Sequence, residues 1–262
     1  MLAQPASIAG NKRINPQHLS HPLADVVKRP AALPDILHSL LRKSPDGVIT
    51  IASGIASRIL DEMNFPVSEL IPIASERSVG KEVTFKGKPY KVVNAQTGLG
   101  MKPTLAIFSA GGDASKEWAP KFAEIGCYVV DNSSAWRMDP TKKLVVPEIN
   151  ACELAPEDRI IANPNCSTIQ MVQVLKPLDD IFNITRVDVA TYQAVSGAGK
   201  GGMEELVNQM QDFFAFKLDQ CEPKTFPYQI ALNLIPQIDV FMDNDYTKEE
   251  MKMVNETKKI LG

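Results

Sequence analysis

Short apolar runs alternate with helix-like stretches between residues 47 and 165. Five of these runs have the length of buried strands, at residues 47–52, 70–74, 105–108, 127–130 and 160–162. Between the runs, apolar residues recur every three or four positions, as Trp118, Phe122 and Ile125 do. This alternation of strands and helices predicts an α/β fold, with a parallel sheet and helices on both of its faces.

Residues 83–92 and the second half of the chain show other patterns. Val83, Phe85, Tyr90 and Val92 flank Lys86-Gly87-Lys88 and predict a hairpin. Alternation at residues 187–191 predicts a strand, and residues 238–241 predict a short one. An apolar stripe at helical spacing predicts a helix, and we interpret this stripe as part of the core: Met203, Leu206, Met210 and Phe213. Thr247, followed three residues later by Glu250, predicts a capping box that opens a last helix.

The stretch from residue 160 to residue 170 combines a strand end with a helix start. Pro164 has no N–H and biases Asn163 toward extended geometry, so we expect the strand to stop there. Asn165, Ser167 and Thr168 are side chains that cap helices, which predicts a helix from about residue 166 to residue 180. Its expected apolar face consists of Met171, Val174, Leu175, Leu178 and Ile181.

Cys166 is therefore predicted to lie at a helix N-terminus. Free N–H groups and the helix dipole favour a negative charge there, and the thiolate is the nucleophilic form of cysteine. A buried structural cysteine is the other interpretation, because most unpaired cysteines are buried. Spacing alone does not separate the nucleophile from the structural cysteine.

Composition narrows the class of protein. The chain has 262 residues, of which 44% are hydrophobic and 23% charged, as in ordinary globular proteins. A net charge of −3 gives no reason to expect nucleic acid or an anionic membrane as a partner. The chain has 4 cysteines without C-x-x-C spacing, which predicts a reducing compartment and no zinc or disulfide framework.

Residues 1–46 differ from the rest of the chain. The segment is rich in proline and basic residues, contains two acidic residues before Asp46, and holds all 3 histidines, His18, His21 and His38. An organelle transit segment and a poorly ordered leader are both compatible with this composition. The prolines favour the leader, because they interrupt an amphipathic helix.

Six segments together resemble the aspartate-β-semialdehyde dehydrogenase family. NPNCSTIQ at 163–170 is similar to the active-site motif of that family. The others follow in the same order as in the family: NFPVSEL at 64–70, ASERS at 74–78, DNSSAWRMD at 131–139, QAVSGAGK at 193–200 and EEMK at 249–252. The resemblance extends from about residue 64 to residue 262.

The resemblance implies a Rossmann-like NADP-binding domain over residues 47–164 and part of an α+β catalytic and dimerisation domain over residues 165–262. It implies a cytoplasmic homodimer that reduces β-aspartyl phosphate to aspartate semialdehyde with NADPH, through a cysteine thioester. This reaction belongs to lysine, threonine and methionine biosynthesis.

The resemblance also assigns roles to residues. Cys166 corresponds to the nucleophile, and the residues matching substrate contacts are Asn165, Arg137, Gln193, Glu249 and Lys252. The residues matching cofactor contacts are Ser75, Arg77, Ser78, Ser109, Ser196 and Gly197. Without the resemblance, Arg77 is an ordinary residue of a solvated turn, Arg137 a lone surface arginine, and Glu249 with Lys252 an exposed helical ion pair.

Two departures from the family pattern leave alternatives open. The turn after the first strand, VITIASGIAS at 48–57, lacks the G-x-x-G-x-x-G spacing of a phosphate cradle. The family's catalytic His and substrate-binding Arg come from a later segment, and this sequence has no His after His38 and no Arg after Arg186. A truncated, weakly active or inactive family remnant is therefore one alternative, and a related acyl-phosphate reductase of the glutamyl type is another.

Overall fold

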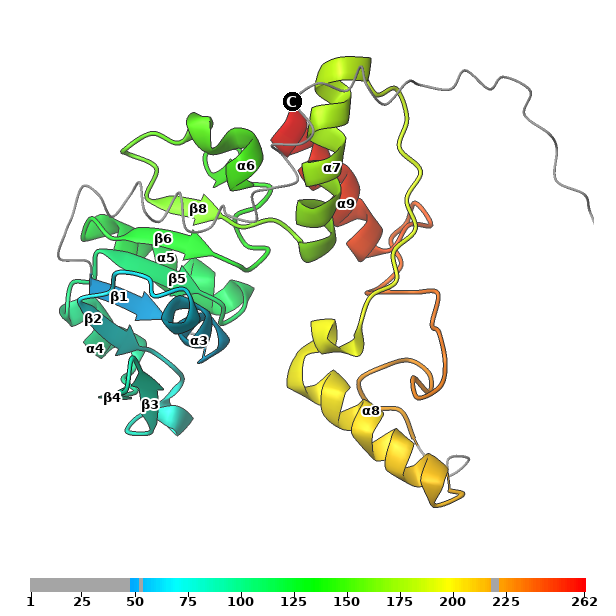
Figure 1. The fold of residues 1–262 in the computed structure, drawn as a ribbon, viewed down its shortest axis with the longest axis horizontal. Helices are drawn as coiled ribbons and strands as arrows, with labels where there is room; N and C mark the ends of the chain where they lie inside the picture. Colours follow the sequence, from blue (N-terminus) through cyan, green and yellow to red (C-terminus); the bar gives the residue numbers. More distant parts are fainter. Residues whose placement is uncertain (1–47, 52–53, 218–221) are drawn as a thin grey trace, which may run out of the picture. The chain divides into compact units, whose positions relative to one another are not determined.

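The computed structural model describes residues 48–51, 54–217 and 222–262 (Figure 1). The expected leader at 1–46 and the turn at 52–53 lie outside these residues. The elements of the first half are β1 (Val48–Ile51), α3 (Gly54–Glu62), β2 (Glu69–Pro72), η2 (Glu76–Ser78), β3 (Glu82–Phe85), β4 (Lys88–Lys91), α4 (Ala95–Gly100), β5 (Leu105–Phe108), α5 (Gly112–Glu124), β6 (Tyr128–Asp131), β7 (Lys143–Leu144), α6 (Pro147–Asn150), η3 (Ala151–Glu153) and β8 (Ile160–Ala162). The second half contains α7 (Cys166–Phe182), η4 (Val195–Ala198), α8 (Gly199–Phe214) and α9 (Lys248–Leu261).

A 6-stranded sheet in the order β2-β1-β5-β6-β8-β7 organises the first half. Neighbouring strands of this sheet pair in parallel. From β1 the chain continues to β2 on one side of β1 and later returns to place β5 on the other side. The strand order therefore reverses between β1 and β5. Ligands of open α/β sheets bind beyond the carboxyl ends of the strands at such a switch point. The predicted Rossmann-like sheet is confirmed.

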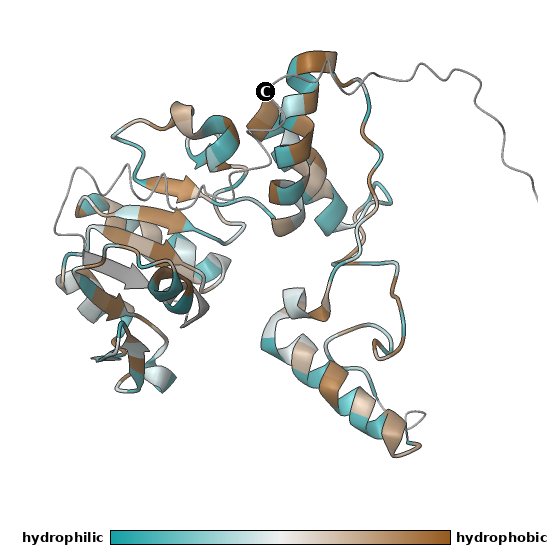
Figure 2. Ribbon diagram, in the orientation of Figure 1, coloured by the Kyte–Doolittle hydropathy of each residue, from teal (hydrophilic) through white to brown (hydrophobic). Residues whose placement is uncertain are grey.

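Helices cover both faces of this sheet. α3 packs against β1, whereas α5 packs against β5, β6 and β8 on the opposite face (Figure 1). Between α5 and the sheet lies an apolar core to which both contribute: Ala106, Phe108, Ala119, Phe122, Cys127, Val129 and Ile160. Figure 2 shows β5, β6 and β8 as mostly hydrophobic, as expected for strands that are buried on both faces.

The predicted hairpin is present as β3 and β4, which pair antiparallel. Its two turn residues, Lys86 and Gly87, have φ angles of 48° and 73°. Positive φ at both central positions is typical of a type I′ turn, which matches the twist of the flanking strands.

α7 begins at Cys166, as the capping residues predicted, but it buries a different face. Thr168 and Val172 are buried, whereas Val174 and Ile181, which belong to the expected apolar face, are more than half exposed. The reason is that α7 packs against α6 and α9, and Val172 lies in one apolar cluster with Ile149 of α6 and Ile260 of α9. Leu175 and Leu178, which also belong to the expected face, are half-buried.

Three predictions for the second half are wrong. Residues 183–194, all of them described, form no strand, and residues 238–241 contribute only a single bridge between Phe241 and Thr247. The expected core stripe of α8 is also incorrect, because Met203 and Phe213 are 44% and 40% exposed. The buried residues of α8 are Gly202, Glu205 and Gln209.

Polar contacts explain why α8 buries Glu205 and Gln209. The Glu205 carboxylate accepts the backbone N–H groups of Lys224 and Thr225. The Gln209 Oε1 accepts those of Ile230 and Ala231, each at 2.9 Å. Buried polar groups must be hydrogen-bonded, and these two side chains satisfy a segment that has no regular structure of its own. Periodicity of apolar residues carries no signal for this arrangement.

None of the helices in the described part of the chain combines the length and the apolar character that crossing a lipid bilayer requires.

A glycine pair in α4 gives a test of the packing against Ile73, the residue that follows β2. A Cβ at Gly98 would lie 2.3 Å from Ile73 Cδ1 and 2.9 Å from Ile73 Cγ1, whereas a Cβ at Gly100 would meet nothing within 4 Å. We expect Gly98→Ala to lower the free energy of unfolding by about 1–3 kcal/mol, because the β-branched Ile73 has few rotamers with which to give way. Gly100→Ala should be neutral or raise it by about 0.4–1 kcal/mol. Urea unfolding of both variants checks this, and equal stabilities would contradict the close approach of Gly98 to Ile73.

Candidate active site

The turn between β8 and α7 positions Cys166. The Asn163 N–H donates to the Asp131 carbonyl at 2.8 Å, which ties the end of β8 to the end of β6. Asn165 has the extended backbone of an N-cap, with φ −60° and ψ 144°. Its Oδ1 accepts the N–H groups of Ser167 at 2.9 Å and Thr168 at 3.3 Å. The predicted cap is therefore formed, and Cys166 is the first residue of the helix.

Cys166 is exposed, whereas Cys127 is fully buried. Asn165 takes up the N–H groups of Ser167 and Thr168, but the Cys166 N–H has no acceptor among the described residues. A free N–H beside a thiol is suited to a developing oxyanion. The exposure of Cys166 contradicts the interpretation as a buried structural cysteine, whereas its role as the nucleophile stays a prediction.

One side of α9 faces this turn. Glu249, in the first turn of the helix, accepts the Asn165 Nδ2–H at 2.9 Å through Oε1. The Lys252 Nζ donates to Glu249 Oε2 at 3.0 Å and to Asp239 Oδ2 at 3.1 Å. α9 starts with the predicted capping box between Thr247 and Glu250. The pair of Glu249 and Lys252 has side chains only 10% and 24% exposed, so the interpretation as an exposed helical ion pair is wrong.

The hydrogen bonds of this cluster shift its charges toward their ionised forms. Burial alone would raise the pKa of Glu249, but the bonds from Asn165 and Lys252 outweigh burial and lower it. Burial would likewise lower the pKa of Lys252, but the bonds to Glu249 and Asp239 raise it above the ordinary value. A carboxylate and an ammonium thus stay charged beside the Cys166 turn at neutral pH.

Gln193 joins the same cluster from the segment after α7. Its Oε1 accepts the hydroxyl protons of Ser167 and Thr191, each at 3.1 Å. Its Nε2 donates to Glu249 Oε1 at 3.5 Å. The side chain therefore lies next to the start of α7, where the family resemblance expects it.

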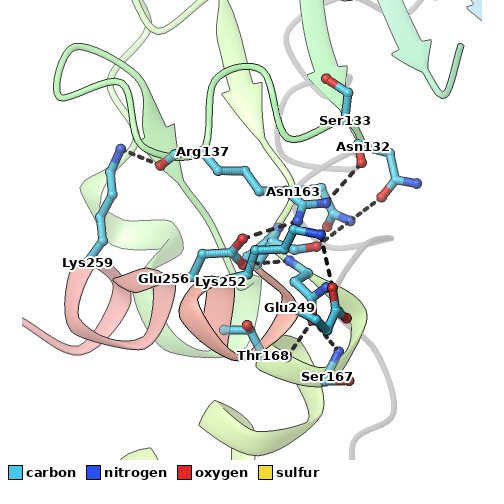
Figure 3. A network of polar contacts seen from close by, with 12 residues as sticks. Asn132, Ser133, Arg137, Asn163, Ser167, Thr168, Glu249, Lys252, Glu256 and Lys259 are labelled. Atoms are coloured by element: carbon cyan, nitrogen blue, oxygen red, sulfur yellow. Dashed lines mark hydrogen bonds and ion pairs between the residues drawn. The ribbon is translucent and has the colours of Figure 1, made fainter. Parts of the chain in front are cut away.

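Arg137 is buried, so the interpretation as a lone surface arginine is wrong. Its Nη1 donates to Glu256 Oε1 at 3.1 Å and its Nη2 to the Asn132 carbonyl at 3.1 Å (Figure 3). Its Nε is buried and has no partner among the described residues. A buried orphan N–H on a guanidinium is unusual and leaves a donor for a ligand.

The loop from Asp131 to Lys142, which carries Arg137, is itself held by buried polar contacts. Asp131, fully buried at the end of β6, accepts the hydroxyl protons of Ser115 and Ser133. On α9, the Lys259 ammonium donates to the carbonyls of Arg137, Asp139 and Lys142 at 2.8, 2.6 and 3.0 Å. Burial lowers the pKa of Lys259.

The candidate cofactor residues of the first half lie beyond the carboxyl ends of β2 and β5. Ser75, Arg77 and Ser109 are exposed, and Ser78 is half-buried. The Arg77 guanidinium has no ion pair among the described residues. Next to them is an apolar cavity of about 390 Å³ whose lining includes Ser75, Ala95, Phe108, Ala110 and Trp118.

Ser196 and Gly197 are not joined to either group by hydrogen bonds between the described residues. Ser196 and Gly197 lie in η4, which packs against α8, and both are exposed. The structure thus brings together Cys166, Asn165, Gln193, Glu249 and Lys252. Glu256 links Arg137 to this cluster, and Figure 3 shows the contact between Glu256 and Arg137.

Sequence reasoning missed Glu256, Lys259 and Asp239, and it included Asp131 only as the first residue of the motif at 131–139. On α9, Glu249, Lys252, Glu256 and Lys259 recur at intervals of three and four residues, so they share one face. That spacing was visible in the sequence. It was not informative by itself, because a charged helical stripe is typical of a solvated face.

Two family models match the chain. Residues 54–156 match the NAD binding domain of semialdehyde dehydrogenases, and residues 175–262 match their dimerisation domain. Aspartate-semialdehyde dehydrogenase of Campylobacter jejuni is 61% identical over 207 residues, and that of Aquifex aeolicus 55% over 212 residues. The chain belongs to the aspartate-semialdehyde dehydrogenase family. The alignments cover 78% of this chain in both cases, but 60% and 61% of the two relatives.

Solved structures of the family agree with the fold. The crystal structure of aspartate semialdehyde dehydrogenase II from Vibrio cholerae superposes with a TM-score of 0.78 and 49% identity, covering 82% of this chain and 66% of the other. A second structure of that protein, complexed with ASA, has a TM-score of 0.78 and 48% identity, with the same coverage. The NAD binding match supports a nicotinamide-nucleotide site in the first half, while the boundary between the two domains near residue 165 stays a prediction.

Glu249 should make stability depend on acid pH. Its pKa in the folded chain is lowered, so the stability that its charge contributes is present above the unfolded pKa of about 4.3 and is lost as pH falls through the folded value. Glu249→Gln should cost about 1–3 kcal/mol at pH 7, because Lys252 and Asn165 lose a charged partner, and much less near pH 3. Melting temperatures from pH 7 to pH 3 check this. Glu124→Gln removes an exposed carboxylate and serves as the control for net charge. If the melting temperatures of the parent and of Glu249→Gln change in parallel with pH, the lowered pKa of Glu249 is contradicted.

Proposed function

We propose that the chain carries the catalytic nucleophile and most substrate contacts of an NADP-dependent aspartate-semialdehyde dehydrogenase. The reaction is the reductive dephosphorylation of β-aspartyl phosphate to aspartate semialdehyde. The observation that carries the proposal is the exposed Cys166 thiol at the start of α7, next to a free N–H and a cluster of Asn165, Gln193, Glu249 and Lys252. Identity of 61% to a family enzyme over the matched residues favours this function over that of an inactive remnant.

Acyl transfer is the step for which these residues are suited. The Cys166 thiolate attacks the β-carbonyl carbon of aspartyl phosphate and forms a C–S bond. The negative charge that develops on the carbonyl oxygen is stabilised by the Cys166 N–H. The intermediate then collapses, the C–O bond to phosphate breaks, and inorganic phosphate leaves with its electron pair. The products of this step are an aspartyl thioester and phosphate.

Charged side chains around the thiol distinguish the two ends of the substrate. Lys252 and Arg137 attract the phosphate, through the ammonium and through the unpaired Nε of the guanidinium. Glu249 stays ionised and attracts the α-ammonium of the aspartyl group. Gln193 is neutral, so it orients the acyl group by hydrogen bonds without competing for the proton.

NADPH, when bound, supplies the hydride that reduces the thioester. The described residues fit this cofactor, because the cavity of about 390 Å³ offers an apolar wall beside Ser75 and Ser109 at the carboxyl ends of β2 and β5. Arg77, exposed and without an ion pair among the described residues, fits a 2′-phosphate and favours NADP over NAD. Ser196 and Gly197 are proposed to complete the cofactor contacts from η4. The dimerisation match supports a homodimer as the working form.

Turnover by the chain tests the function. NADPH formation from aspartate semialdehyde, phosphate and NADP should depend on all three reactants, and Cys166→Ser should lower kcat by about 10³-fold or more, because the hydroxyl is a far weaker nucleophile. Glutamate semialdehyde, one methylene longer, is the competing substrate. Cys152→Ser removes another exposed thiol and should keep full activity. A kcat that Cys166→Ser leaves unchanged, or a preference for glutamate semialdehyde, contradicts the proposal.

Arg77 tests the choice of cofactor. Arg77→Gln should raise the KM for NADP about tenfold and leave the KM for NAD within about twofold, since only NADP carries the 2′-phosphate that the guanidinium binds. Steady-state rates with both cofactors measure this. Arg58→Gln removes an exposed arginine of α3 that pairs with Glu62 and should change neither KM. If Arg77→Gln weakens both cofactors equally, the residue does not read the 2′-phosphate.

A further inference from the structure

Glu256 is an acidic residue with 1% exposure that none of the acyl-transfer steps uses. It lies seven residues after Glu249, so it is two helical turns, about 10 Å, further along the same face of α9. Its Oε1 accepts Arg137 Nη1–H at 3.1 Å (Figure 3), and its Oε2 accepts the backbone N–H of Asn165 at 2.6 Å. One carboxylate therefore bridges the candidate phosphate-binding arginine and the residue that precedes the nucleophile.

Asn165 is engaged through three of its polar groups. Its side-chain oxygen caps α7, its side-chain nitrogen donates to Glu249, and its backbone N–H donates to Glu256. Two carboxylates on α9 thus hold Asn165 from two directions. Because Cys166 follows directly, its backbone position relative to α9 is fixed.

Arg137 is held with equal definition. Glu256 takes one N–H of Nη1 and the Asn132 carbonyl takes one of Nη2, which leaves the buried Nε without a partner among the described residues. A guanidinium is planar, so two such contacts set the plane and thereby the direction of the free N–H.

We propose that Glu256 is a positioning residue that sets the distance and orientation between the anion-binding face of Arg137 and the Cys166 thiol. This inference rests on the proposed function in that phosphate is taken as the anion. Glu256 touches neither substrate nor thiol in this role, and acts through Arg137 and Asn165.

Protection of Cys166 by inorganic phosphate tests the proposal without turnover. The full chain is treated with iodoacetamide at about pH 7, where cysteine is partly thiolate, over a range of phosphate concentrations, and alkylation is followed peptide by peptide. Phosphate should slow alkylation of Cys166 and leave the exposed Cys152 unaffected. Cys127, whose burial raises the pKa of its thiol to about 12, should react only if the chain unfolds and so reports on folding.

Glu256→Gln keeps the shape of the side chain but presents an NH₂ to one of two donors. We expect about tenfold more phosphate for half-protection of Cys166, with Cys127 unreacted and the Cys152 rate unchanged. Glu124→Gln is the control, since it makes the same change at an exposed carboxylate of α5 and should leave protection as in the parent. In the turnover assay, the KM for phosphate should rise about tenfold and the KM for NADP stay within about twofold, which a mere loss of folded protein cannot produce.

Unchanged protection in a folded Glu256→Gln variant overturns the proposal, as does the absence of phosphate protection in the parent. If Cys127 becomes reactive in Glu256→Gln, the variant is not folded and Glu256→Asp replaces it, because this change keeps the charge and shortens the side chain by one methylene. Phosphate protection of Cys166 that is weaker by about threefold or more in Glu256→Asp supports the positioning role, and protection equal to that of the parent overturns it. The two ideas separate cleanly. If the chain turns over but phosphate protection does not depend on Glu256, the proposed function holds and the role of Glu256 is wrong. If protection depends on Glu256 but the chain shows no turnover, the role of Glu256 holds and the proposed function is wrong.

Discussion

The arrangement of the candidate site depends on the way α9 holds Asn165. Glu249 and Glu256 are 84 and 91 residues away from Asn165 in sequence, and each accepts one of its N–H groups. Asn165 in turn caps α7 and so determines where that helix starts. The position of Cys166 is thus a long-range property of the chain, although the capping motif itself is local. Without α9, α7 would keep its cap and its packing against α6 but would lose both carboxylates that hold Asn165.

The same contacts place several charges out of water, which has a cost. Arg137 and Glu256 form a buried ion pair with side chains 9% and 2% exposed. Buried pairs of this kind contribute little net stability, because desolvation offsets most of their attraction, but loss of one partner costs about 3–5 kcal/mol. An apolar pair of similar volume in place of Arg137 and Glu256 would stabilise the core equally well. A guanidinium with a fixed plane and an unpaired N–H suits the proposed anion site, and that role accounts for the buried charges better than stability does.

The sequence predicted those parts of the fold that depend on local patterns. The five core strands, the hairpin at Lys86-Gly87 and the caps at Asn165 and Thr247 follow from apolar runs and from side chains that bind nearby backbone. The failures lie where burial is polar. Residues 187–191 alternate like a strand and yet form none, and α8 buries Glu205 and Gln209 because they satisfy N–H groups of residues 224–231. Hydropathy assigns such residues to solvent, and only the tertiary contacts reveal the reverse. Glu256 escaped notice for the same reason, whereas Glu249 and Lys252 were found through family motifs.

Parallel strand order brings motifs that are distant in sequence to one edge of the sheet. Ser75, Ser109 and Cys166 follow β2, β5 and β8, Asp131 is the last residue of β6, and all four strands end at the same edge of the sheet. β2 and β8 are four strand spacings apart, which is about 19 Å at a spacing of about 4.8 Å. A ligand that reaches from Arg77, beyond β2, to the thiol beyond β8 must therefore be long and must cross the switch point between β1 and β5. A dinucleotide has that extended form, with charge in its middle, whereas a small acyl phosphate can occupy only the end near α7. In the proposed function, strand order thus separates a cofactor region near β2 from a substrate region near α7, and hydride transfer would bring the two together at the carboxyl end of β8.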